Sequence, residues 1–80
     1  MRGGHDYYTK GVMGVITRIR IQDVAAGQVA IIETARETNY PPQVTVKGRD
    51  PDAVLAECQR LAGLIDAGSP IPAKHTDLDQ

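Results

Sequence analysis

The sequence predicts an α+β fold, a small antiparallel sheet of about three strands with one C-terminal helix packed on one face. Three observations support this. Residues 43–47 alternate polar and β-branched side chains, which is typical of a half-buried strand. A helix start followed by apolar residues at helical spacing comes next. The N-terminal half then carries two further β-branched runs, over residues 15–22 and 28–38. A helix with one apolar stripe needs such a sheet to cover it.

The helix is predicted over residues 51–67. The segment Asp50–Asp52 supplies an N-cap carboxylate, a proline at the first helical position and a negative charge in the first turn. Gly68 is a natural left-handed stop, and Pro70 prevents continuation. Apolar residues recur at helical spacing between these limits and form one stripe. The stripe consists of Val54, Leu55, Cys58, Leu61, Ala62 and Ile65.

The first predicted strand covers residues 15–22, followed by a turn over 23–27 in which Gly27 can take a positive φ. Strict alternation places two sets of side chains on opposite faces of this strand. One set is Val15, Thr17, Ile19 and Ile21, and the other is Ile16, Arg18, Arg20 and Gln22. We expect the first set to face the helix.

Residues 28–38 admit two interpretations. Their β-branched run predicts a strand, with Val29 and Ile31 facing one way and Ala30 and Ile32 the other. A helix from Asp23 would also form a fair apolar stripe, although it would carry an internal glycine that costs about 1 kcal/mol. The strand gives the order βββα and is favoured. The helix gives the alternative βαβα.

The domain boundaries follow from local composition. Residues 1–12 are rich in glycine and polar side chains and predict a flexible N-terminal arm; residues 13–68 form a single domain; residues 69–80 predict a solvated, flexible C-terminal tail. The prolines of Asn39–Pro42 break the chain, and we expect Tyr40 to cover one end of the core.

Composition restricts both the core and the function. The chain has 80 residues and a net charge of −1. Because it contains no Trp or Phe, its core must be aliphatic. A single cysteine allows no internal disulfide, and no Cys/His cluster has the spacing of metal ligands. The sequence shows neither a signal peptide nor a membrane span, so we expect a cytoplasmic protein. Cys58 reads as a buried structural residue, and no catalytic constellation, metal site or cofactor site is predicted.

A patch on the uncovered side of the sheet is the predicted partner-binding site. In the favoured register, Ile16, Ala30 and Ile32 face away from the helix and form an apolar cluster, and such clusters usually mark an interface. We therefore expect a noncatalytic protein that binds a protein partner or a second copy of itself, through this face or an edge strand. The predicted partner-binding residues are Ile16, Arg18, Arg20, Ile32 and Arg36.

The alternative function is nucleic-acid binding. Arg18, Arg20, Lys47 and Arg49 could line a basic surface. The predicted order of three strands and a helix is also that of the end of double-stranded RNA-binding domains. Those domains carry lysines at the helix start, however, where this chain has Asp50–Asp52. The protein-partner hypothesis is therefore preferred.

The corner Gly48-Arg49-Asp50-Pro51-Asp52-Ala53, which follows a strand and leads into an alanine-rich helix, resembles a corner in some anti-CRISPR proteins of Pseudomonas phages. More broadly, the architecture and size resemble small inhibitors encoded by phages and other mobile elements. This resemblance implies a protein that acts by occupying a surface of a larger complex. It carries over no individual functional residue.

Overall fold

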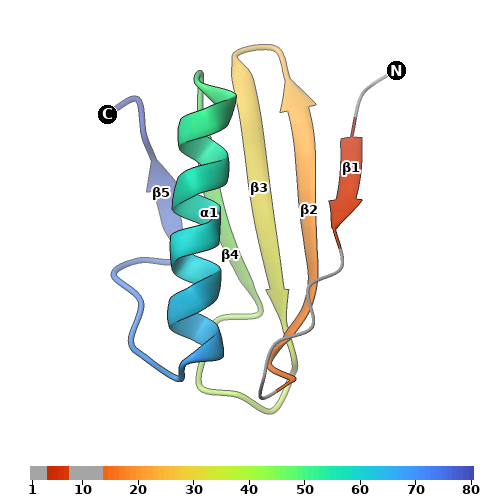
Figure 1. The fold of residues 1–80 in the computed structure, drawn as a ribbon, viewed down its shortest axis with the longest axis vertical. Coiled ribbons are helices and arrows are strands. Elements are labelled where there is room, and N and C mark those ends of the chain that lie inside the picture. The colour runs from red at the N-terminus through yellow and green to blue at the C-terminus, as the bar shows by residue number, and fades with distance from the viewer. Residues whose placement is uncertain (1–3, 8–13) are drawn as a thin grey trace.

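The computed structural model describes residues 4–7 and 14–80. This part of the chain forms five strands and one helix (Figure 1). In chain order they are β1 (Gly4–Tyr7), β2 (Ile16–Val24), β3 (Gly27–Thr34), β4 (Gln43–Gly48), α1 (Pro51–Asp66) and β5 (His75–Asp77).

The strands form one sheet in the order β1-β2-β3-β4-β5. The pairs from β1 to β4 are antiparallel, whereas β5 runs parallel to β4, which makes the sheet mixed. The α+β class and the βββα order of the central elements are confirmed, because the three predicted strands are β2, β3 and β4. The sheet is wider than predicted, since a short strand is added at each edge (Figure 1).

The hairpin between β2 and β3 decides the ambiguous segment. Val24 pairs with Gly27, so only Ala25 and Ala26 turn the chain. Gly27 has a φ of 145°, and a side-chain carbon there would overlap the backbone of Gly48. Only glycine combines this conformation with so close a strand neighbour. The strand interpretation of residues 28–38 is therefore confirmed over its first seven positions, and the helical alternative is wrong.

The start and stop of α1 follow the sequence closely. Asp50 is the N-cap, and its Oδ1 accepts a hydrogen bond from the backbone N–H of Asp52 at 3.0 Å. Gly68 adopts a φ of 74° just beyond the helix. The backbone N–H of Ser69 then donates to the carbonyl of Leu64 at 2.8 Å, which satisfies a carbonyl of the last turn.

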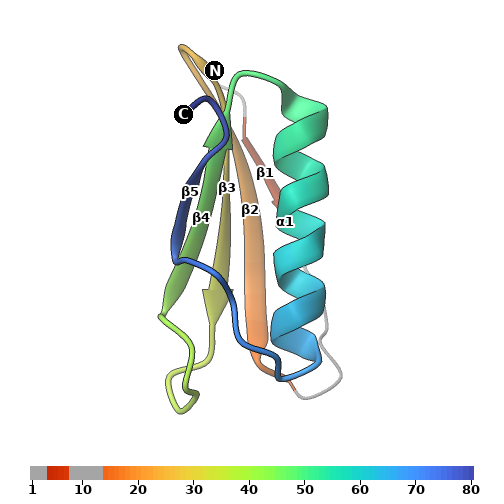
Figure 2. The same ribbon diagram turned by 90° about the vertical axis from the view of Figure 1, so that its left-hand side faces the viewer.

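The helix covers one face of the sheet, above β3 and β4 and partly above β2, while no other element of the described residues packs on the opposite face (Figure 2). The core between the two layers is aliphatic apart from one cysteine, as predicted. Leu55 is the exception in the predicted helix stripe, because 39% of it stays exposed. The buried residues are Ile16, Ile19, Ile21, Ala30, Ile32, Val44, Val46, Val54, Cys58, Leu61, Ala62 and Ile65.

The predicted facing of Ile16, Ala30 and Ile32 is wrong. All three are buried under the helix, with Ile16 only 3% exposed and Ile32 fully buried. Ile16 pairs with Thr34 while Arg18 pairs with Glu33, so Thr17 is an extra residue in β2. This bulge breaks the strict alternation of β2 and puts Ile16 on the same face as Ile19 and Ile21. Ala30 and Ile32 join that face because the two-residue turn places them opposite Ile21 and Ile19.

The segments predicted as arm and tail both contribute strands. Within the predicted arm, residues 4–7 pair with β2, from Gly4 opposite Gln22 to Tyr7 opposite Ile19; the rest of the arm lies outside the described residues. Within the predicted tail, residues 75–77 form β5 beside Thr45–Lys47. Both strands are held by backbone hydrogen bonds at a sheet edge, and such pairing leaves little trace in side-chain periodicity.

Two contacts bring the predicted tail back to the sheet. Ile71 and Tyr40 are partly buried against the core. The phenolic oxygen of Tyr40 donates a 2.7 Å hydrogen bond to the carbonyl of Ser69. Tyr40 therefore covers an end of the core, as expected, and also ties the chain after α1 to the loop before β4.

Candidate functional site

The uncovered face of the sheet is the main candidate for a functional surface. It lies on the side away from α1 (Figure 2). Cross-strand partners share a face, so the register from β2 to β5 defines its side chains in rows. We call this surface the open face. Its residues are Arg18, Arg20 and Gln22 on β2, Val29, Ile31 and Glu33 on β3, Gln43, Thr45 and Lys47 on β4, and His75 and Asp77 on β5.

Two aliphatic side chains occupy the centre of the open face. Val29 and Ile31 lie on β3 and are partly exposed. They take the place that the sequence analysis assigned to Ile16 and Ile32. Both alternating sets of β3 are apolar, so periodicity alone could not decide which set faces the helix. The missing information was the length of the hairpin turn, because pairing Val24 with Gly27 places Ala30 and Ile32 opposite Ile21 and Ile19.

The arginines of the open face are less available to a ligand than their number indicates. Arg20 Nε lies 3.3 Å from Glu33 Oε2, and both side chains are about three-quarters buried, with 27% and 26% of their surface exposed. The Nε atom is buried and makes no well-aligned hydrogen bond, so this contact is an ion pair only. Arg18 lies beside it and is exposed. Arg36 is also exposed, but it lies in the turn after β3 and outside the strands that form the open face.

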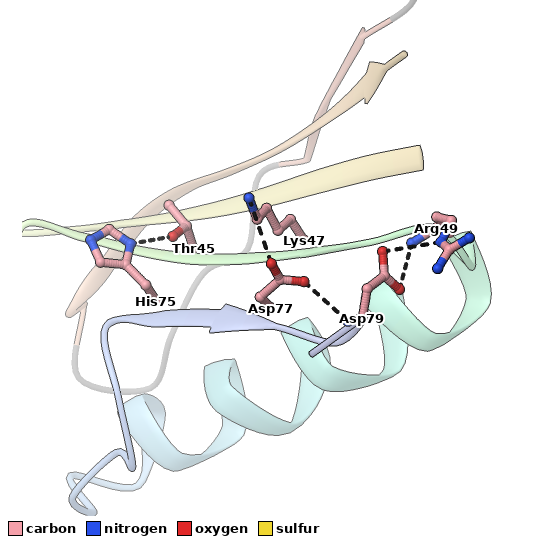
Figure 3. A network of polar contacts seen from close by, with 6 residues as sticks. All are labelled: Thr45, Lys47, Arg49, His75, Asp77 and Asp79. Carbon is pink, nitrogen blue, oxygen red and sulfur yellow. Dashed lines mark hydrogen bonds and ion pairs between the residues drawn. The ribbon is translucent and has the colours of Figure 1, made fainter. Parts of the chain in front are cut away.

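A row of polar contacts joins β4 to β5 (Figure 3). The Thr45 hydroxyl lies 2.7 Å from His75 Nδ1, and its donor or acceptor role depends on the tautomer of the ring. One row further along, Lys47 Nζ lies 3.7 Å from Asp77 Oδ2. Both pairs are on the open face and extend it onto the edge strand. They were missed by the sequence analysis, because residues 69–80 were assigned to a tail.

The contacts continue past the end of the two strands. Arg49 Nε lies 3.5 Å from Asp79 Oδ2, and the backbone N–H of Arg49 donates to Asp79 Oδ1 at 3.3 Å (Figure 3). The backbone N–H of Asp79 donates to Asp77 Oδ1 at 3.0 Å, which holds the two acidic residues in one tight turn. Arg20, Lys47 and Arg49 are therefore each paired with a carboxylate.

The Thr45–His75 contact is the arrangement closest to a catalytic pair. An open hollow of about 460 Å³ lies beside it, lined by Thr45, Lys47, His75, Thr76, Asp77 and Gln80. A hydroxyl nucleophile needs a base that a third group orients. Among the described residues, the contact with Thr45 is the one side-chain hydrogen bond of His75, and the ring is exposed. The pair is better understood as a contact that holds β5 on β4.

Cys58 lies in the core and carries no sign of reactivity. It is 1% exposed, and burial raises the pKa of its thiol to about 11. The thiol therefore stays protonated at neutral pH, whereas a reactive cysteine needs an accessible thiolate. Within residues 4–7 and 14–80, no group of three His, Cys, Asp or Glu side chains is placed to hold a metal ion.

Comparison with protein-family models, with curated proteins and with solved structures found no match. In the part of the chain that the structure describes, no helix has the length and apolar character needed to cross a membrane. The functional argument therefore depends on the open face and on the polar contacts at its edge.

Proposed function

We propose that the protein is a noncatalytic binding protein whose open face docks on a protein partner, as an inhibitor or accessory subunit of a larger complex. The observation that carries this proposal is the one-sided architecture of the sheet (Figure 2). One face is sealed by α1, and the other presents Val29 and Ile31 inside a rim of polar and charged side chains. Protein interfaces have this arrangement of an apolar centre and a polar rim.

The size of the open face is adequate for this role. The molecule measures 33 × 27 × 17 Å, and the sheet lies across its two longer dimensions (Figure 1). Each partner in a standard protein interface buries about 800 Å². A partner covering most of the open face would approach this area. The same surface could serve a symmetric homodimer, because one patch then contacts its own copy.

Two observations favour a protein over a nucleic acid. Arg20, Lys47 and Arg49 are each already paired with a carboxylate, so phosphate binding would have to break these pairs. Sheets that bind single strands stack bases on aromatic side chains. The strands β2 to β5 contain no Tyr, Phe or Trp.

Substitution on the open face tests the proposal. Ile31→Glu should leave the fold intact, because the side chain is partly exposed on the face away from the core. It should abolish capture of the partner from lysate of the native host, or dissociate the dimer in sedimentation equilibrium. Gln59→Glu adds the same charge at an exposed position of α1 and should change neither result. Equal loss of capture in both variants, or no loss in either, would contradict the assignment.

A nucleic-acid titration addresses the alternative directly. At low salt, neither mixed-sequence duplex nor single strands should bind the protein in a way that depends on Arg18. Binding that falls steeply with salt and is lost in Arg18→Glu would favour a nucleic-acid-binding module instead.

A further inference from the structure

β5 covers only part of the edge of β4. β4 extends over Gln43–Gly48, and β5 pairs with Thr45, Val46 and Lys47 alone. The pairing is parallel, which is slightly less stable per residue than antiparallel pairing. An exposed strand edge is the ordinary acceptor for an added strand of another chain.

The contacts that hold β5 are few and exposed. Among the described elements β5 contacts β4 alone, and no residue from 67 to 80 is buried. Two backbone bonds bracket the strand: Thr45 N–H donates to Lys74, and Leu78 N–H donates to Lys47, both at 2.9 Å. The remaining side-chain contacts lie at the surface: two ion pairs, which contribute little in water, and the hydrogen bonds between Thr45 and His75 and from the Arg49 N–H to Asp79. Such an element opens more readily than the core strands.

We propose that the edge of β4 binds an extended acidic segment of another protein, and that β5 occupies this site as an internal competitor. The chemistry of the site can be read from its present occupant. Asp77 and Asp79 place carboxylates beside Lys47 and Arg49 (Figure 3). Leu78, between the two acids, packs over Gly48. The site therefore selects a segment in which an aliphatic residue lies between two acidic residues.

Gly48 is the position that makes room for the aliphatic residue. A side-chain carbon on Gly48 would lie 3.1 Å from Leu78 Cβ and 3.3 Å from Val54 Cγ2. The missing side chain lets Leu78 approach the end of the core. Leu78 nevertheless remains 37% exposed, so the present occupant fills this position incompletely.

A foreign segment can compete because it can pair with more of β4. The internal strand has the advantage of its tether, which corresponds to an effective concentration in the millimolar range for a short flexible link. A longer segment could also reach Gln43, which follows the alternation of Thr45 and Lys47 toward this edge and which β5 does not pair with. Residues 72–74 are exposed and lead into β5, so they can act as the hinge on which β5 leaves the edge of β4.

The probe for this site is a fluorescein-labelled peptide with the sequence of residues 74–80, KHTDLDQ. In the full chain, Asp77→Asn with Asp79→Asn weakens the internal competitor but leaves Lys47 and Arg49 for the peptide. Anisotropy should show binding tighter than to the wild type by about two- to thirtyfold, the range for two exposed ion pairs. Glu37→Gln with Asp52→Asn makes the same charge change at exposed positions outside β5 and should leave the affinity unchanged.

Further variants locate the bound peptide. Lys47→Glu with Arg49→Glu should abolish binding, and so should replacing both aspartates of the peptide by asparagine. Ile31→Glu on the open face should have no effect, which separates this site from the proposed function. In NMR spectra, the amide signals of residues 44–48 and 75–78 should change together as the peptide displaces β5.

Three results would overturn the proposal. The first is absence of binding to Asp77→Asn/Asp79→Asn at millimolar peptide while its circular dichroism remains native. The second is equal affinity in that variant and the charge-matched control. The third is self-association of the wild-type chain that Asp77→Asn/Asp79→Asn abolishes, because the occupant would then be the C-terminal segment of a second copy.

Discussion

Neighbouring isoleucines of β3 provide a direct test of the register that defines both the core and the open face. Ile32 is fully buried beneath α1, whereas Ile31 is partly exposed on the open face. Truncation of an isoleucine to alanine loses about 0.8 kcal/mol per buried carbon, or about 2.4 kcal/mol in transfer free energy. The cavity left in a packed core adds to this loss. Ile32→Ala should therefore lower the free energy of unfolding by about 3–5 kcal/mol.

Ile31→Ala should lower it by less than about 1.5 kcal/mol, since part of the side chain already contacts water and no closed cavity forms. Urea denaturation measures both values, and an unchanged m-value would show that the midpoint shift reports stability. The whole domain is expected to have a stability of about 4–12 kcal/mol, so Ile32→Ala removes a large share of it. Similar losses in the two variants, or a larger loss for Ile31→Ala, would mean that β3 is shifted by one residue and that the open face is misassigned.

Four other changes test separate parts of the structure. Gly27→Ala should destabilise the domain severely, because its φ of 145° is unfavourable for alanine and the new carbon would overlap Gly48; thermal melting of this variant beside Ala26→Gly, in the exposed turn, would show whether the effect is specific. Asp50→Ala should lower the unfolding free energy by about 0.5–2 kcal/mol through loss of the N-cap bond to α1, measured in urea. Tyr40→Phe should lower it by about 0.5–1.5 kcal/mol, since only the hydrogen bond to the carbonyl of Ser69 is lost. Burial raises the pKa of the Cys58 thiol from 9.0 to about 11, so the stability that the protonated thiol contributes is complete below pH 9 and is lost as pH rises to about 11. The free energy of unfolding of the wild type should therefore fall more steeply over that interval than that of Cys58→Ala. Parallel curves would contradict the burial of the thiol.

Local signals in the sequence were enough for the helix and the three central strands. The cap at Asp50, the stop at Gly68 and the stripe around Leu61 act within a few residues of one another, so they can be read without knowing the fold. The alternation over residues 43–47 and the β-branched run after Gly27 are equally local. These features also determined that the core is aliphatic and that one helix leaves one face of the sheet uncovered.

Tertiary structure decided which residues lie on that uncovered face and how the sheet ends. The facing of Ile16 depends on a bulge at Thr17, and that of Ile32 depends on the two-residue turn that places it opposite Ile19; both are set by the pairing of β2 with β3. The edge strands depend on backbone hydrogen bonds between segments far apart in the chain, such as Lys74 with Thr45. Side-chain periodicity carries no record of such bonds, because every residue except proline offers the same backbone donor and acceptor. The sequence by itself therefore determined the helix, the three central strands and the apolar composition of the core, while long-range pairing determined the edge strands and the residues of the open face.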